Sequence, residues 1–340
     1  MSNTPRTVLV TGGAGYVGSH VVRQLLDRGD RVRVLDLLLY GDQGLRALRG
    51  HERLTVIAGD VRHPAAMQSA AAGADTVIAL AALVGNAACE LDRDATVAIN
   101  REATELLVET CVESRVRRLV FASCCSVYGT GADPLLMESS TLNPLSLYAH
   151  TRVESERIID AHGDRLSAVI LRLPTVFGLS PRMRLDLLVN TLTTHAYFRG
   201  KIRVSGRGQA RPHLHVEDAA AALLLAADAR ETLVRGQRFN VGDDRSNHSV
   251  REIAAIVAAA LPGVEVAVEP QLCDARSYRV SFSKIRKTLG FAGRFSVADG
   301  VEQIVAACRR GAIRGLDDPR HSNFESVKRF GVPELLLHAA

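Results

Sequence analysis

The sequence predicts an α/β fold in which a doubly wound parallel sheet is followed by a smaller C-terminal lobe. Short β-branched runs alternate with helical patterns through the first half of the 340-residue chain. Most of these runs are apolar, which is typical of parallel strands buried on both faces. A glycine-rich turn also joins the first run to the first helical pattern. Repeated strand–helix units need right-handed crossovers, and these generate a doubly wound sheet.

The expected elements of the first half follow one another closely. Strands are expected at 7–12, 31–36, 54–60, 76–82, 118–123 and 167–173. The first helix is expected at 15–29, where Gly29 supplies a C-terminal stop. Its apolar stripe consists of Val17, Val21, Val22, Leu25 and Leu26. Further helices are expected at 97–114 and 148–162.

After about residue 175 the alternation breaks down. Loops, helices and short strands are mixed there, although 249–261 and 297–310 have the pattern of amphipathic helices. We therefore divide the chain into a sheet domain at 1–175, to which later segments return, and a lobe formed mainly by 176–340. A cleft between the two is the expected place for a ligand.

Composition narrows the classes of function. The net charge is +5 and the isoelectric point is near 9.0, but the arginines are scattered and only 4% of residues are aromatic. Nucleic-acid binding favours clustered cations and stacking aromatics, so we expect no nucleic-acid partner and favour anionic small molecules. The only lysines are Lys201, Lys284, Lys287 and Lys328, which leaves arginine as almost the sole cation.

Targeting and metal-binding patterns are not found. Apolar runs such as 219–227 are much shorter than the roughly 20 residues that span a bilayer, so no membrane partner is expected. Polar residues lead directly into the first strand, which does not resemble an export signal. The six cysteines have neither metal-ligand spacing nor the arrangement of a disulfide framework. We expect a reduced, cytoplasmic protein with no metal site.

The turn "TGGAGYVGSH" predicts a dinucleotide-binding loop. Gly12, Gly15 and Gly18 fall between the first strand and the first helix, with Tyr16 and Val17 among them. A pyrophosphate there needs a tight turn, close backbone approach and free N–H groups at the positive end of a helix. A lone glycine pattern is weak evidence, but its place between strand and helix strengthens it.

Two acidic positions extend this site. Asp36 ends the second strand about 20 residues on, where a carboxylate would bind ribose hydroxyls. Its negative charge would repel a 2′-phosphate, so NAD is predicted in preference to NADP. Asp60 and Val61, at the end of the third strand, suit the edge of the adenine ring.

Together these motifs resemble the extended short-chain dehydrogenase/reductase superfamily, and within it the nucleotide-sugar epimerase/dehydratase branch. The resemblance covers roughly residues 7–310 and rests on the glycine loop, Asp36, Asp60–Val61, "LAA" at 80–82, Asn100, "SVYG" at 126–129 and Tyr148. It implies a Rossmann-type NAD-binding domain and a C-terminal lobe that grips a nucleoside-diphosphate sugar. It also implies a homodimer formed through helices near 100–114 and 148–162. The implied cofactor contacts include Leu80, Ala81, Ala82, Asn100, Ser123, Tyr148 and Arg152.

Tyr148 matches the acid/base of this branch, which oxidises a sugar carbinol to a ketone. A tyrosine phenol has a pKa of about 10, and a nearby cation lowers it by favouring the phenolate. That cation is Arg152, where the family carries lysine. Four residues along a helix bring Arg152 to the face of Tyr148, so it can supply charge. A guanidinium cannot relay a proton, and this leaves either retained function or loss of the redox step.

A second departure lies in "FASCCSVYG" at 121–129. Cys124 stands where the family has a Ser or Thr hydroxyl, and a thiol is a weaker hydrogen-bond donor. Cys125 and Ser126 stand where 4,6-dehydratases usually have acidic residues, which argues against 4,6-elimination. Either cysteine could donate a proton, since thiol pKa values lie near about 8.5, or both could simply pack against the cofactor.

The resemblance also implies contacts to the sugar nucleotide. Asn190 of "LVNTL", Arg211 of "QARPHLHVED" and Arg276 of "DARSYRVSFSK" are predicted to bind its diphosphate. A forked guanidinium suits that task because it binds phosphate oxygens in pairs.

The functional hypothesis is NAD-dependent epimerisation, or oxidation, at C4 of a nucleoside-diphosphate sugar. A dehydratase or 3,5-epimerase reaction is the first alternative. The second alternative is a non-catalytic NAD-binding sensor or scaffold, since Arg152 and Cys124 replace the usual lysine and hydroxyl.

Overall fold

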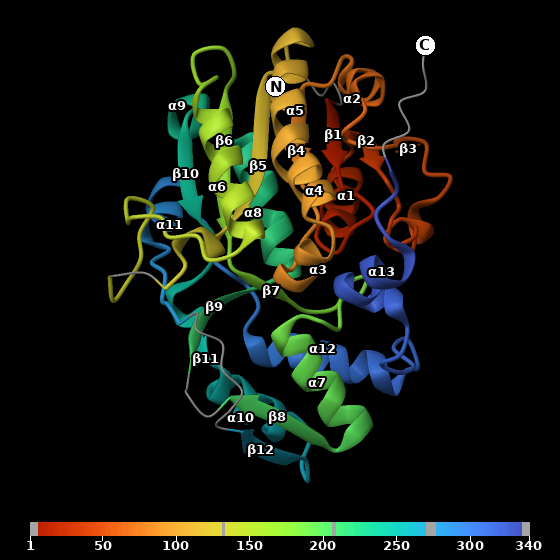
Figure 1. Cartoon of the computed structure of the whole chain (residues 1–340), viewed down its shortest axis with the longest axis vertical. Helices are drawn as coiled ribbons and strands as arrows, with labels where there is room; N and C mark the ends of the chain where they lie inside the picture. The colour runs from red at the N-terminus through yellow and green to blue at the C-terminus, as the bar shows by residue number, and fades with distance from the viewer. Residues whose placement is uncertain (1–5, 131–132, 206–208, 270–276, 335–340) are drawn as a thin grey trace.

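Seven parallel strands form the central sheet in the order β10-β6-β5-β4-β1-β2-β3 (Figure 1). They are β1 (Thr7–Thr11), β2 (Arg31–Asp36), β3 (Leu54–Ala58), β4 (Thr76–Ala79), β5 (Arg118–Cys124), β6 (Ala168–Leu173) and β10 (Gln237–Asn240). The computed structural model describes residues 6–130, 133–205, 209–269 and 277–334. The chain starts at a central strand, winds to one edge and then to the other, so the predicted doubly wound sheet is confirmed.

The edges of the sheet differ from the expectation. The predicted strand at 54–60 is β3, but Thr55 and Val56 are exposed, because β3 is an edge strand with a partner on one side only. The other edge is β10, a strand that the sequence pattern did not predict. It pairs with β6, and Phe239 is its only apolar residue, which is too little for a periodicity argument.

Helices cover both faces of the sheet. One face carries α1 (Gly18–Asp27) and α8 (Val216–Asp228), and the other carries α2 (Pro64–Ala71), α5 (Ala103–Glu113) and α6 (Leu147–Asp160). Four residues of the predicted stripe, Val21, Val22, Leu25 and Leu26, are buried in α1, whereas Val17 precedes the helix and is half-buried. Gly29 follows the helix at a φ of +91°. The helix expected at 97–114 is divided into α4 (Arg93–Val97), a π-helical turn at Ala98–Glu102 and α5.

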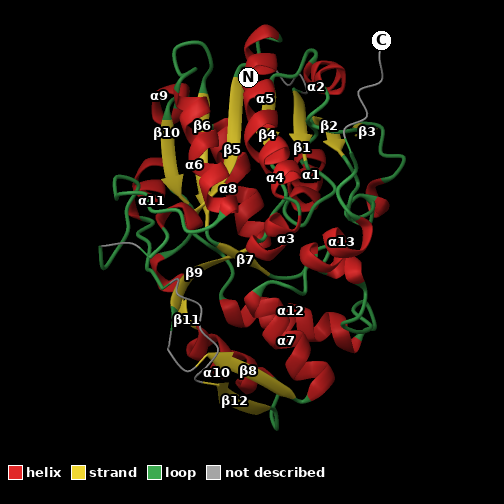
Figure 2. Cartoon of the chain, viewed as in Figure 1, coloured by secondary structure: helices red, strands yellow, loops and turns green. Residues whose placement is uncertain are grey.

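The C-terminal lobe lies below the large sheet in Figure 2. Its elements are β7 (Thr175–Phe177), α7 (Leu188–Arg199), β8 (Lys201–Ser205), β9 (Ala210–His215), β11 (Asn247–Ser249), α10 (Val250–Ala260), β12 (Glu265–Glu269) and α12 (Val297–Arg309). Strands β11, β9 and β7 form one small sheet, and β12 and β8 form another. A core of aliphatic residues joins α7, α10 and α12 to β8.

Four further α-helices lie in the described chain, besides short 3₁₀ turns. They are α3 (Asn86–Leu91), α9 (Glu231–Val234), α11 (Ser283–Leu289) and α13 (Asn323–Phe330). Helix α13 returns to the large-sheet domain and packs against α3, beside the carboxyl ends of the strands. No helix in the described ranges is long and apolar enough to cross a bilayer.

Candidate active site

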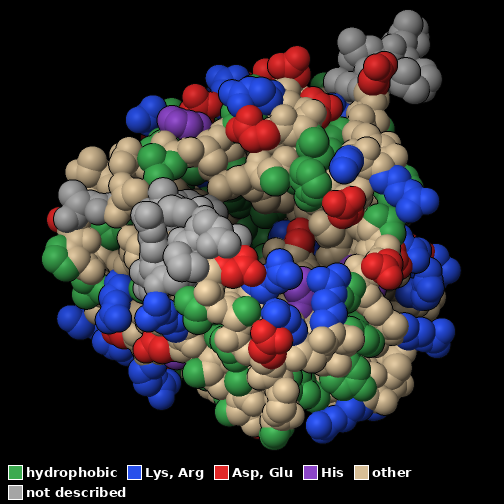
Figure 3. Space-filling model, turned by 60° about the horizontal axis from the view of Figure 1, so that its bottom comes forward, with side chains coloured by type: hydrophobic (Ala, Val, Ile, Leu, Met, Phe, Trp, Pro, Cys, Tyr) green, Lys and Arg blue, Asp and Glu red, His purple; other side chains and the backbone are tan. Residues whose placement is uncertain are grey.

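A cleft of about 830 Å³ lies between the carboxyl ends of the sheet strands and the C-terminal lobe. Residues that follow β1, β4, β5 and β6 line one side, and the segment between β7 and α7 lines another. In the space-filling view, one face is hollowed near its middle, and lysine and arginine side chains gather beside the hollow (Figure 3). Doubly wound sheets bind ligands at this edge, so the cleft is the candidate active site.

The glycine-rich turn leaves room for a phosphate. Gly12 has a φ of +74°, and a Cβ atom there would lie 2.7 Å from the backbone N of Ala81. A Cβ atom on Gly18 would collide with the carbonyl oxygen of Gly12. Gly15 lines the cleft, and beyond its chain neighbours such a Cβ atom would approach only that same oxygen among the described atoms, at 3.1 Å. The space lies at the positive end of α1, which has no acidic residue in its first turn, so it fits a pyrophosphate.

The residues predicted for the adenosine end, Asp36, Asp60 and Val61, all line the cleft. The carboxylate of Asp36 accepts hydrogen bonds from the backbone N of Ala14 at 2.9 Å and of Leu38 at 2.8 Å. Burial raises the pKa of Asp36, and these two N–H groups partly offset that rise. Asp60 is ion-paired with Arg62, at 2.6 Å from Oδ2 to Nη2. The two carboxylates are therefore held in place before any ligand binds.

The loop after β4 forms the next part of the wall. Leu80, Ala81 and Ala82 line the cleft as predicted. Asn100 does not, because its amide holds that loop from behind. Its Oδ1 accepts from the backbone N of Leu83 at 2.8 Å, and its Nδ2 donates to the Leu83 carbonyl at 2.9 Å. The cofactor contact predicted for Asn100 is thus corrected to support of the loop.

Tyr148 and Arg152 lie together in the wall, on the first turns of α6. Ser146 caps this helix by accepting a hydrogen bond from the backbone N of Ala149 at 3.3 Å. The Arg152 guanidinium carbon is 5.5 Å from the ring centre of Tyr148 and 5.4 Å from that of Phe121. Desolvation raises the pKa of Tyr148, and the charge of Arg152 opposes this rise.

Arg152 has few partners within the protein. It is 3% exposed, and its one hydrogen bond to a described residue runs from Nη1 to the carbonyl of Ala122 at 3.4 Å. Its buried Nε and Nη2 have no partner among the described residues. Because Arg152 lines the cleft, these donors fit the hydroxyls of a bound ribose, which supports the predicted cofactor at this end of the cleft.

The two adjacent cysteines have different surroundings. Cys124 lines the cleft and interacts with the hydroxyl of Tyr148, and burial raises the pKa of its thiol. Cys125 lies outside the cleft, fully buried, and its Sγ donates to the carbonyl of Arg172 at 3.4 Å. Strand β5 ends at Cys124 and a 3₁₀ turn begins at Cys125, so the chain turns between them and only the Cys124 thiol reaches the cleft. The catalytic role offered for Cys125 is therefore corrected.

Ser123 precedes Cys124 and lies at the edge of the cleft. Its hydroxyl donates to Oε1 of Glu156 at 2.5 Å, so it is committed to the protein interior. The same carboxylate receives Nε and Nη2 of Arg172, at 3.0 and 2.6 Å. The strand that carries Cys124 is thus tied to α6, which carries Tyr148.

The predicted substrate contacts fall in three different places. Arg211, on β9, lines the cleft. Asn190 is fully buried outside it, because its amide is used by Gly178, Tyr16 and Arg184 at 3.0, 3.0 and 2.8 Å. Its predicted diphosphate contact is corrected to a structural role. Arg276 lies outside the described residues.

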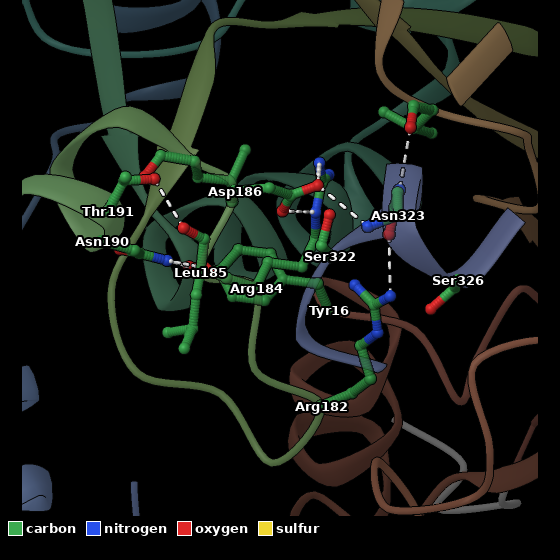
Figure 4. Close-up of polar contacts among 12 residues, drawn as sticks. Tyr16, Arg182, Arg184, Leu185, Asp186, Asn190, Thr191, Ser322, Asn323 and Ser326 are labelled. Atoms are coloured by element: carbon green, nitrogen blue, oxygen red, sulfur yellow. Dashed lines mark hydrogen bonds and ion pairs between the residues drawn. The ribbon is translucent and has the colours of Figure 1, made fainter. Parts of the chain in front are cut away.

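A polar cluster that the sequence reasoning did not find lies beside the glycine-rich turn (Figure 4). Its members Arg182, Arg184, Asp186 and Asn323 all line the cleft. Arg184 pairs with Asp186, and Nη2 of Arg182 donates to Oδ1 of Asn323 at 2.7 Å. The charged segment "PRMRLD" after β7 was the only sequence signal for this cluster. No local pattern connects that segment to Asn323 on α13.

The segment from 8 to 242 matches the model of the NAD dependent epimerase/dehydratase family. The chain belongs to this family. The predicted family, its Rossmann-like fold and its dependence on NAD are thereby confirmed.

Individual relatives agree with this placement. The dTDP-glucose 4,6-dehydratase of Streptomyces griseus is 30% identical over 311 residues, which cover 88% of this chain and 93% of that protein. The UDP-glucose 4-epimerase of Halalkalibacterium halodurans is 28% identical over 275 residues, which cover 73% and 78%. The solved structure of MoeE5 in complex with UDP-glucuronic acid and NAD is 33% identical, with a TM-score of 0.77 and coverage of 90% and 99%.

Proposed function

We propose that the chain epimerises a nucleoside-diphosphate sugar at C4 through a keto intermediate; net oxidation at C4 is the other outcome of the same first step. The observation that carries this proposal is the grouping of Tyr148, Arg152 and Cys124 on one wall of the cleft, beside the glycine-rich turn. The sugar-nucleotide class is supported by relatives named for UDP-glucose epimerisation and dTDP-glucose dehydration, and by MoeE5 with its bound UDP-sugar and NAD.

Tyr148 would take the proton of the C4 hydroxyl. When bound, NAD would supply the acceptor for the hydride of the same carbon and would be the source of its return to the other face. Because desolvation disfavours the phenolate of Tyr148, the fixed positive charge of Arg152 is needed to stabilise it. The Cys124 thiol, which interacts with the Tyr148 hydroxyl, would contact the same sugar oxygen as a weak donor. Tyr148 would then return its proton to the oxygen once the carbon has been inverted.

Elimination of water is disfavoured by the carboxylates of the cleft. The acidic residues that line its described part are Asp36, Asp60 and Asp186. Backbone N–H groups hold Asp36, and arginines pair with Asp60 and Asp186. None is free to act as the acid of a 4,6-dehydratase, and Cys125 points away from the cleft. These observations favour epimerisation over dehydration, although several relatives are named as dehydratases.

The far wall of the cleft would hold the substrate diphosphate. Arg211 of β9 and Arg203 of β8 bring guanidinium groups to this wall, and Tyr278 lies there too. Guanidinium forks match pairs of phosphate oxygens. We assign the diphosphate to Arg211, and the base of the nucleotide to the apolar side chains at the start of α7.

We further propose a cytoplasmic homodimer. The outward faces of α5 and α6 would form the interface. Exposed Glu105 and Glu109 on α5 and exposed Arg157 on α6 offer charges of opposite sign to a second copy. The described cysteines are free thiols, which suits a reducing compartment. Light scattering of the purified chain measures the oligomeric state directly.

Tyr148→Phe tests the proposed function. The change removes only the hydroxyl, so turnover of the accepted sugar nucleotide should fall about 10²- to 10⁴-fold, the usual contribution of a positioned acid/base. NAD binding should persist, because the ring remains. NMR of the products identifies the inverted carbon. Full turnover by the variant would exclude Tyr148 as the base, and loss of water from the sugar would identify a dehydratase instead.

A further inference from the structure

The segment that follows β7 is anchored on the glycine-rich turn rather than on the far wall of the cleft. The hydroxyl of Tyr16 donates to the carbonyl of Gly178 at 2.6 Å. The hydroxyl of Ser180 donates to the carbonyl of Tyr16 at 2.8 Å. These contacts bring Arg182, two residues farther on, to the half of the cleft that contains the dinucleotide loop.

Arg182 is a buried cation that forms no ion pair with any described carboxylate. It is 3% exposed, and the neutral amide oxygen of Asn323 is its one hydrogen-bond acceptor among the described residues. Its buried Nε has no partner in this part of the chain. Arg184 differs, since Asp186 neutralises it at 2.9 Å. Burial and the charge of Arg184 lower the pKa of Arg182 to about 10, as expected of a cation that still lacks an anion.

Neighbouring side chains fix the guanidinium in place. Its carbon lies 4.2 Å from the ring centre of Tyr40, which follows β2 and also lines the cleft. Asn323 fixes the other side, because its Nδ2 donates to the carbonyl of Val84 at 2.8 Å and its backbone N to Asp186 at 2.9 Å. Figure 4 shows Arg182 and Asn323 facing each other across this contact.

Asp36 does not take the place of the missing anion. Its charge acts on Arg182 through space, but no ion pair or hydrogen bond joins the two side chains. Both Asp36 oxygens are occupied by backbone N–H groups. A buried cation beside an anion-binding turn is stabilised when a bound phosphate pairs with it.

We propose that Arg182 binds the pyrophosphate of the dinucleotide cofactor, and that Tyr40 and Asn323 hold its guanidinium in position for that contact. The pyrophosphate would then be bound both by the backbone of the glycine-rich turn and by a side chain of the segment after β7. This inference deepens the proposed function, in which the cofactor stays bound through both hydride steps. Two other phosphates have the same chemistry, the 2′-phosphate of NADP and the diphosphate of the sugar nucleotide, and the experiment separates them.

The test uses the full chain freed of cofactor and measures binding by calorimetry, without turnover. ADP carries the diphosphate, and adenosine is the matched probe without it. In Arg182→Met, the affinity for ADP should fall roughly 10- to 100-fold, the value of a hydrogen-bonded charge, while adenosine binding stays the same. Arg182→Lys should show a smaller loss, because it keeps the charge without the fork. Arg309→Met, an exposed change at the end of α12, is the control for net charge and should leave ADP binding unaltered.

Four results would overturn the proposal. Unchanged ADP affinity in Arg182→Met would do so, as would an equal loss for ADP and adenosine. A loss confined to UDP or dTDP would assign Arg182 to the sugar nucleotide. A wild-type preference for 2′,5′-ADP over ADP that disappears in the variant would assign it to a 2′-phosphate. Thermal melts show whether each variant is folded. If Arg182→Met does not fold, the ADP affinity of Arg182→Lys is used to test the proposal. Since turnover is not scored, failure of the C4 assignment would leave these results intact.

Discussion

Arg172 and Arg152 are both buried beside β5, yet their electrostatic surroundings are opposite. Arg172, on β6, gives two N–H groups to Glu156 at 3.0 and 2.6 Å and a third to the hydroxyl of Tyr128 at 2.8 Å. Arg152, on α6, makes one long hydrogen bond and leaves two buried nitrogens without a partner among the described residues. Arg172 lies behind the wall of the cleft, whereas Arg152 lies in it.

This difference in pairing distinguishes an arginine that supports the fold, Arg172, from one that is available to a ligand, Arg152. A buried charge that is fully paired contributes a fixed scaffold, and breaking its pair is costly. A buried charge whose donors remain free at a cleft is complete only when a ligand binds. Changes on the Arg172 side should therefore reduce stability, and changes on the Arg152 side should reduce activity.

The largest expected effect is a loss of stability when the ion pair of Arg172 with Glu156 is broken. Glu156→Ala would strand Arg172 without its carboxylate, and we expect the free energy of unfolding to fall by about 3–5 kcal/mol. Chemical denaturation measures this loss. Glu154→Ala, on the exposed face of the same helix, is the matched control and should have little effect. A stable Glu156→Ala protein would show that the pair is not needed for the fold.

The next largest effect is expected on turnover, when the unpaired Arg152 is replaced. Arg152→Met should lower turnover roughly 10- to 100-fold, the value of one charge-assisted contact. The melting temperature of the cofactor-free protein should rise, because an unpaired buried charge is removed. Loss of the cation raises the pKa of Tyr148, so the acidic limb of the pH–rate profile should move to higher pH. A large fall in melting temperature would place Arg152 with the structural arginines.

Arg152→Lys refines that result. Lysine keeps the charge and restores the residue usual in the family, but it loses the planar group between the rings of Phe121 and Tyr148. We expect about a tenfold loss of turnover with little displacement of the pH profile. A gain in rate would instead mark the arginine as a handicap.

The smallest effect concerns Asn190, whose amide is paired on every side. Asn190→Ala would leave the backbone N of Gly178 without its acceptor and lower stability by about 2 kcal/mol. The KM for the sugar nucleotide should stay the same, because Asn190 lies outside the cleft. A raised KM without loss of stability would restore the predicted substrate contact.

Much of the fold could be predicted because its signals are local. Most strands of the first half are short apolar runs, and the glycine turn, Asp36 and Tyr148 stand at fixed positions relative to those runs. The strand β10 was missed because its few residues form no periodic pattern. It is recognisable only through its pairing with β6.

The site was predicted less completely. Its composition depends on where side chains point and on contacts between residues that are far apart in the sequence. Cys124 and Cys125 are neighbours in sequence, but the strand ends between them, and only Cys124 lines the cleft. Arg182 and Asn323 lie 141 residues apart, so no local pattern connects them. Asn190 matched the family position, but its amide is consumed inside the protein.

Helix α13 has a consequence for synthesis. The floor of the cofactor site is made by the first strand–helix unit, whereas Asn323 and Phe324 on the opposite side belong to the last described helix. A nascent chain that has emerged only as far as α12 could form its sheet, but it would lack this side of the site. Tight loading of NAD would therefore mark a chain whose α13 has emerged from the ribosome, and a series of stalled chains with a C-terminal spacer would show where loading begins.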